Sequence, residues 1–184
     1  MSYSQSYQKT LKELHQSKAF GNKSGIPQEV IDCIEKYQVT SFLDFGCGKG
    51  YFLEALKAKY PSIEMHGFDP GNNNFQTLPD KVDMIYSSDV LEHIEPDKLE
   101  ETIKDLKSRC SKVMYHLIAC HPAKRIMNDG RNAHLIIHLP EWWRKLLTLT
   151  CNFNIVLEKI TQRQANPKKG PAINGYEYIF IIEK

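Results

Sequence analysis

The stretch "LDFGCGKGYF", Leu43–Phe52, decides the fold, because glycines occupy every second position immediately after a short apolar run. The run itself, "SFLDF" at 41–45, is apolar and aromatic, which predicts a buried strand leading into the glycines. A helix is expected to begin near Gly50. Glycine tolerates unusual backbone angles and lets the main chain approach a ligand without an intervening side chain. The order of strand, glycine turn and helix therefore predicts a ligand site at the carboxyl edge of a parallel sheet.

The rest of the chain alternates predicted strands with predicted helices. Further strands are expected at "IEMHGFD" (63–69), "VDMIYSS" (82–88) and "KVMYHLIA" (112–119), and helices at 27–37, 50–60 and 95–108. Two more strands, "NIVLEKI" (154–160) and "GYEYIFIIE" (175–183), follow one another without a helix between them. This order predicts an α/β fold: an open, mostly parallel, Rossmann-like sheet with helices on both faces and a C-terminal antiparallel hairpin.

Composition limits the protein to a few classes. With 184 residues, 41% hydrophobic and 25% charged, we expect a single globular domain over 1–184, with 1–26 as an N-terminal cap segment and 121–150 as a substrate or lid region. The net charge of +2 gives no indication of a nucleic-acid or membrane partner. The N-terminus has no apolar core typical of a signal peptide, and no stretch reaches membrane-spanning length. The five cysteines lack a C-x-x-C pair, which favours free thiols and a cytoplasmic location. No feature indicates an oligomeric state.

The spacing of the glycines narrows the choice of ligand. Gly46, Gly48 and Gly50 form G-x-G-x-G, one residue shorter than the dinucleotide fingerprint, and Asp44 lies two positions before them. A carboxylate at this place would repel a phosphate and would suit a cationic amino group. Asp69 follows Gly50 by 19 residues, about the spacing of a ribose-binding carboxylate. The expected ligand has a ribose, a positive charge and no phosphate, as S-adenosylmethionine (SAM) does.

Three motifs resemble those of the class I SAM-dependent methyltransferases. "FLDFGCGKG" resembles their motif I, "GFDP" their second acidic motif, and "VDMIYSSDVLEHI" their fourth strand with the turn that follows it. The resemblance runs from about residue 40 to 120 and implies a seven-stranded sheet whose last strand is antiparallel. It also implies cofactor contacts from Asp44, Gly46, Cys47, Gly48, Gly50, Asp69, Ser88 and Asp89. In that family a helix and a third strand usually follow the ribose carboxylate, but only twelve residues, 70–81, are present here. We therefore expect a sheet shortened after the second strand and a more open cofactor pocket.

A second group of residues, Asp89, Glu92 and His93, follows the same strand, and His134 comes later in the chain. Two subgroups of the family bind Mg²⁺ or another divalent ion through such an acidic-x-x-Glu-His turn and a later histidine. These are the ubiquinone-pathway O-methyltransferases and the 2′-O-methyltransferases of small-RNA ends. The resemblance makes Asp89, Glu92, His93 and His134 candidate metal ligands, and mixed carboxylate and imidazole ligands suit Mg²⁺, Mn²⁺ or Fe²⁺. The alternative is a structural Glu-His pair with His134 as a lone base or an ordinary loop histidine.

The predicted reaction is methyl transfer from SAM to an oxygen of a small-molecule acceptor, with metal assistance left open. An oxygen nucleophile must lose its proton to a base or a metal, whereas an amine needs only to be neutral. His93 and His134 are the candidate catalytic residues, because they are the only predicted neighbours able to do this. N-methylation of a small amine stays open. The alternative class is a cofactor-binding, non-catalytic methyltransferase-like module or partner subunit.

Overall fold

The computed structural model describes residues 25–127, 129–150, 152, 154–163 and 175–183. The predicted cap segment therefore lies outside the described residues except for its last two positions. The helices are α2 (Gln28–Lys36), α3 (Tyr51–Lys59), α4 (Pro96–Arg109) and α5 (Pro140–Lys145), with a short 3₁₀ helix η1 (Leu91–His93) and a π-helical segment η2 (Leu146–Thr150). The strands are β1 (Ser41–Phe45), β2 (Glu64–Phe68), β3 (Val82–Ser88), β4 (Cys110–Cys120), β5 (Asn154–Arg163) and β6 (Gly175–Glu183).

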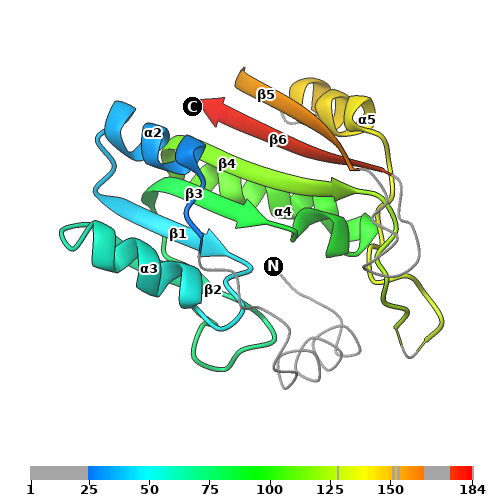
Figure 1. The fold of residues 1–184 in the computed structure, drawn as a ribbon, viewed down its shortest axis with the longest axis horizontal. Coiled ribbons are helices and arrows are strands. Elements are labelled where there is room, and N and C mark those ends of the chain that lie inside the picture. Colours follow the sequence, from blue (N-terminus) through cyan, green and yellow to red (C-terminus); the bar gives the residue numbers. More distant parts are fainter. Residues whose placement is uncertain (1–24, 128, 151, 153, 164–174, 184) are drawn as a thin grey trace.

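The strands form one mostly parallel sheet, in the order β2-β1-β3-β4-β6-β5 (Figure 1). Parallel ladders join β1 to β2 and β3, and β3 to β4, while β6 runs antiparallel to both β4 and β5. The predicted Rossmann-like sheet and its C-terminal antiparallel hairpin are confirmed. The seven strands implied by the resemblance are not, because the sheet has six strands in the described part of the chain. Residues 70–81 form only turns, since one parallel crossover alone needs a dozen or more residues.

Helices cover both faces of the sheet, as predicted (Figure 1). Side chains of α2 and α3, including Val30, Phe52 and Leu56, pack on one face against the aromatic residues of β1, β3 and β4. Those of α4 and α5, including Leu99 and Trp143, pack on the other face. The two adjacent tryptophans of α5 differ in burial: Trp143 is fully buried and Trp142 is not. Among the described residues, no helix is long and apolar enough to span a membrane.

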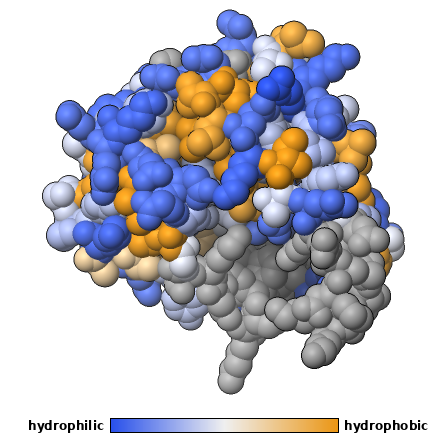
Figure 2. Space-filling view, turned by 45° about the horizontal axis from the view of Figure 1, so that its top comes forward, coloured by the Kyte–Doolittle hydropathy of each residue, from blue (hydrophilic) through white to orange (hydrophobic). Residues whose placement is uncertain are grey.

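The edge strand β5 exposes several large apolar side chains. Val156, Leu157 and Ile160 are each exposed, and so is Leu149 in the neighbouring η2. Figure 2, which turns the side with β5 and α5 forward, shows apolar patches separated by polar side chains. Scattered exposure of this kind is ordinary for a folded protein surface.

His116 in the middle of β4 predicts a measurable dependence of stability on pH. Its ring is buried, its Nδ1 atom lies 2.7 Å from Ser87 Oγ, and burial lowers the pKa of His116 to about 3. An unfolded histidine titrates near pH 6.5, so the unfolded chain binds more protons below that pH, and the contribution of the neutral ring is lost as the pH falls. From pH 7 to pH 5, His116 should lower the free energy of unfolding by about 2 kcal/mol.

Urea denaturation of the native protein and His116→Gln at pH 7, 6 and 5 measures this contribution. The native protein should lose stability more steeply than the variant, and equal slopes would contradict the prediction. The comparison with the variant is needed because burial also lowers the pKa of His93 to about 4, so that His93 too binds a proton over this interval only in the unfolded chain.

Candidate functional site

The glycine turn after β1 requires glycine for its backbone and for its packing. Gly46, Gly48 and Gly50 have φ angles of +85°, +56° and +83°, in the left-handed region that other residues rarely adopt. A Cβ atom at Gly46 would lie 2.3 Å from a methyl carbon of Val90, and one at Gly50 would lie 2.8 Å from the ring of Phe75. The side chains of Val90 and Phe75 therefore pack closely against two of the three glycines.

The carboxylate of Asp69 ties this turn to the end of β2. Gly48 N donates a hydrogen bond to Asp69 Oδ2 at 2.9 Å, and Gly71 N donates one to Oδ1 at 2.8 Å. The side-chain amide of Asn72 donates to Gly48 O at 2.7 Å. Both main-chain polar groups of Gly48 are thus held by the segment after β2. Sequence reasoning missed Asn72 and Phe75, which stand in the loop that replaces the missing third strand.

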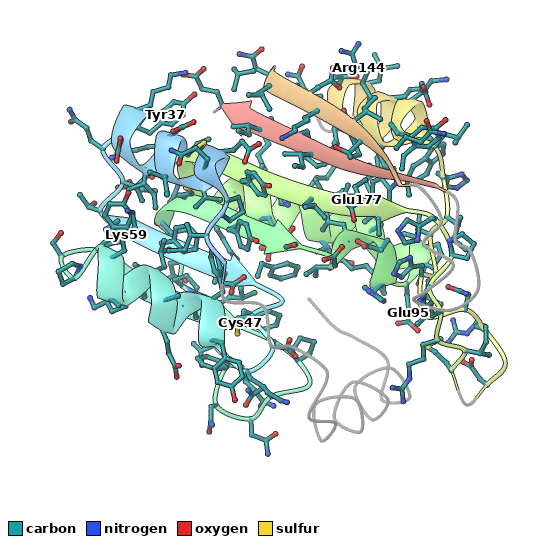
Figure 3. All side chains as sticks on the ribbon, viewed as in Figure 1. Tyr37, Cys47, Lys59, Glu95, Arg144 and Glu177 are labelled. Carbon is teal, nitrogen blue, oxygen red and sulfur yellow. The ribbon has the colours of Figure 1, made fainter. Side chains whose placement is uncertain are left out.

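Two buried carboxylates make this edge of the sheet acidic. Asp44 in β1 and Asp69 after β2 are both buried, and both help raise the pKa of the Cys47 thiol, of which burial is the main cause. Cys47 is therefore a neutral thiol and not a nucleophile. Figure 3 places Cys47 in the turn after β1 and Glu95 just before α4, both toward the side where the parallel strands end. A cationic ligand fits such an edge better than an anionic one.

A second cluster lies beyond the end of β3. Glu92 and His93 come from η1 and His134 comes from the segment after β4, and their potential ligand atoms all lie within 4.8 Å of one another. Ala119 N donates a hydrogen bond to Glu92 Oε1 at 3.0 Å, which fixes the buried carboxylate. Asp89, the fourth predicted ligand, is not brought into this cluster: it is exposed and has a φ angle of +57°.

Hydrogen bonds to main-chain oxygens determine which nitrogen of each imidazole carries the proton. His93 Nδ1 donates to Ala133 O at 2.7 Å, and His134 Nδ1 donates to His121 O at 2.5 Å. When either ring is neutral, its lone pair therefore resides on Nε2. The two rings meet edge to face with centroids 4.7 Å apart. Burial, and to a lesser extent His134, lowers the pKa of His93 to about 4, so His93 is neutral near pH 7.

The first part of the predicted substrate or lid region, residues 121–127 and 129–134, contains the antiparallel bridge of Ile126 with Asn132 and presents these carbonyl groups. Ala133 N donates to Arg125 O at 3.0 Å, and the amide of Asn132 exchanges two hydrogen bonds of 2.9 Å with the main chain of Ala123. Asn132 Oδ1 also accepts from His134 N at 2.9 Å. Sequence reasoning missed Asn132 and His121. The only signal for His121 was its place directly after a strand, and no signal marked Asn132.

Comparison with known proteins agrees with this architecture. A family model described as a methyltransferase domain matches residues 4–153. No curated protein matches the sequence. Magnesium protoporphyrin IX methyltransferase from Synechocystis PCC 6803, solved with bound SAM, is 15% identical with a TM-score of 0.62, and the match covers 100% of both chains.

Two other solved structures share the fold. The 1,6-didemethyltoxoflavin-N1-methyltransferase from Burkholderia thailandensis is 14% identical with a TM-score of 0.61, covering 100% of this chain and 91% of that one. A SAM-dependent methyltransferase from Methanosarcina mazei is 13% identical with a TM-score of 0.56, covering 82% and 96%. The family match spans most of the sequence, and the sheet order agrees with it. The chain therefore belongs to the methyltransferase domain family, in agreement with the class I SAM-dependent methyltransferase that its glycine turn predicts.

Proposed function

We propose that this protein transfers a methyl group from SAM to a hydroxyl oxygen of a small-molecule acceptor, assisted by a divalent metal ion. The observation that carries the proposal is the cluster of Glu92, His93 and His134, whose potential ligand atoms lie within 4.8 Å of one another. Each imidazole is oriented by a main-chain oxygen at Nδ1, as metal-binding histidines usually are.

The cofactor end of the site is assigned to the glycine turn and its two carboxylates. Asp44 would neutralise the ammonium group of the methionine portion, next to the main chain of 46–50. Asp69 would accept the ribose hydroxyl groups, because a carboxylate oxygen that already accepts one N–H bond has capacity for another. Ser88 and Asp89 would lie along the cofactor, which gives Asp89 a role outside the metal cluster.

Val90 connects the two ends of the site. Its side chain packs against Gly46, and it stands two positions before Glu92 in the chain. The methyl donor and the metal cluster are therefore expected to be close neighbours. Such positioning is the main contribution that an enzyme makes to an in-line displacement.

The donor set fits Mg²⁺, Mn²⁺ or Fe²⁺, with the two imidazoles favouring the transition metals. A bound ion would lower the pKa of the acceptor hydroxyl and orient its oxygen. Two residues of the chain have the properties that binding such an ion requires. Glu92 offers a buried carboxylate, and His93 stays neutral near pH 7, with its lone pair on Nε2. These features support oxygen as the acceptor atom, since a neutral amine needs no such help.

Metal titration tests the proposal. Calorimetry with Mn²⁺ should detect binding to the native protein and about 100-fold weaker binding to Glu92→Gln and His134→Ala, because each variant loses one ligand. The affinity for SAM should change less than twofold. His66→Ala is the matched control, because His66 lies in β2 and is not part of the cluster.

Activity gives the second measurement. Transfer of a labelled methyl group to a panel of small alcohols, phenols and amines should favour the hydroxyl compounds and should fall when EDTA is added. Oxygen methylation that is unaffected by EDTA, or equal Mn²⁺ binding by the native protein and both variants, would disprove the metal-assisted reaction.

A further inference from the structure

A cavity of about 340 Å³ is lined in part by the residues that directly follow His134 in the chain. The first turns of α4 (Pro96, Leu99), the segment Leu135–His138 and Trp142 line it. None of these residues is an acid, a lysine or an arginine, and most are aliphatic or aromatic. The volume falls at the lower end of the range for small-molecule sites, which are mainly apolar with few polar groups. The lining therefore suits an uncharged ligand.

Two aromatic rings give one wall of the cavity a flat surface. His138 and Trp142 are stacked, with ring centroids 4.1 Å apart and an angle of 20° between the planes. Trp142 remains 36% exposed, while the buried Trp143 meets it edge to face at 5.2 Å and holds it in place. A stacked pair that is already ordered can accept another planar ring at little cost in side-chain entropy.

The cavity is joined to the metal cluster through the main chain. Leu135 follows His134 directly, and Ile136 N donates a hydrogen bond to Glu92 O at 3.0 Å. Ile137, which lines the cavity, is three residues after His134. Three residues of extended chain span at most about 10 Å, so the Cα atoms of these two residues lie within that distance. In Figure 1 the segment Leu135–His138 belongs to the connection that runs from the carboxyl end of β4 to α5.

We propose that this cavity binds the aromatic end of the methyl acceptor, while the acceptor's hydroxyl group lies at Glu92, His93 and His134. The acceptor is then an uncharged, elongated phenol or aromatic alcohol, whose ring and reacting oxygen lie up to about 10 Å apart. The assignment of the ring to an acceptor rests on the proposed function. The binding of a ring in the cavity does not depend on the metal.

Binding of biphenyl-4-ol, measured by calorimetry, tests the cavity itself. Trp142→Ala should weaken binding about tenfold, because the stacking surface is lost. Ile137→Asp should weaken it at least as much, because a carboxylate is placed on an apolar wall. Ile160→Asp is the matched control: Ile160 is also exposed but lies on β5, outside the cavity lining, and this variant should bind like the native protein. No binding, or equal binding by all four proteins, would overturn the proposal.

A further variant separates this proposal from the metal-assisted reaction. Glu92→Gln should lose Mn²⁺ binding and keep its affinity for biphenyl-4-ol. In the native protein with SAM and Mn²⁺, methyl transfer to biphenyl-4-ol should be about tenfold faster than to phenol, and Ile137→Asp should remove the preference. If the ring binds but the native protein shows no such preference, the cavity is not the acceptor site. If Mn²⁺ binding fails while the ring binds as expected, only the metal-assisted reaction is disproved.

Discussion

Replacing Gly46 with valine is expected to abolish binding of SAM, with a loss of affinity of at least about 1,000-fold. The residue has a φ angle of +85°, which a β-branched side chain adopts only under strain. Its Cβ atom would also lie 2.3 Å from Val90, so the turn would have to move away from β3. Such a movement would displace the main chain of 46–50, which is predicted to contact the methionine portion of SAM. Calorimetric titration with SAM measures the loss.

Gly130→Val is the control for the strain alone. Gly130 has nearly the same φ angle, +84°, but a Cβ atom added there meets nothing within 4 Å. This variant should bind SAM like the native protein, although its backbone is equally strained. If Gly46→Val binds SAM as tightly as Gly130→Val does, the turn after β1 does not hold the cofactor.

Replacing Asp69 with alanine should weaken SAM binding by about 100- to 10,000-fold. Two ribose hydroxyls would lose hydrogen bonds to a charged partner, each contributing about 1.5–3 kcal/mol. The glycine turn would also lose the bond from Gly48 N, which adds to the effect. The affinity for SAM is again measured by calorimetry, and the melting temperature is recorded for each variant.

Asp83→Ala separates a loss of cofactor contacts from a general loss of stability. Asp83 stands near the start of β3, where hydrogen bonds from Thr40, Ser111 and Lys112 hold the pKa of its carboxyl well below the usual range. This variant should melt at a lower temperature and bind SAM normally. An Asp69→Ala protein that kept native affinity would remove the ribose assignment.

The sheet and the glycine turn could be predicted from the sequence because the signals are local. A short apolar run such as 41–45 indicates a strand by itself, and the amphipathic spacing of 95–108 indicates a helix. The observed β1 and α4 confirm both within about a residue. The seven strands implied by the resemblance were wrong for the described part of the chain, whose sheet has six. The length of residues 70–81 already indicated the smaller number, because they are too few for a helix and a further strand.

The cluster of Glu92, His93 and His134 was predictable only in part. The pairing of Glu92 with His93 follows from their positions next to each other, but His134 stands 41 residues later. The membership of Asp89 depended on its backbone, which turns left-handed and leaves the side chain exposed. No periodicity or spacing reports such an angle for a single aspartate. Of the four predicted ligands, the structure brings together Glu92, His93 and His134.

The sequence by itself determined the alternation of strands and helices, the glycine turn and the acidic residues beside it. These depend on local sterics and on the burial of one face, which each segment records in its own residues. Only the tertiary structure decided that His93 and His134 meet, which of their nitrogens donates to a main-chain oxygen, and that the residues after His134 line an apolar cavity with α4 and Trp142. Those outcomes come from hydrogen bonds and packing between segments far apart in the chain, such as those of His93 with Ala133 and of Glu92 with Ile136.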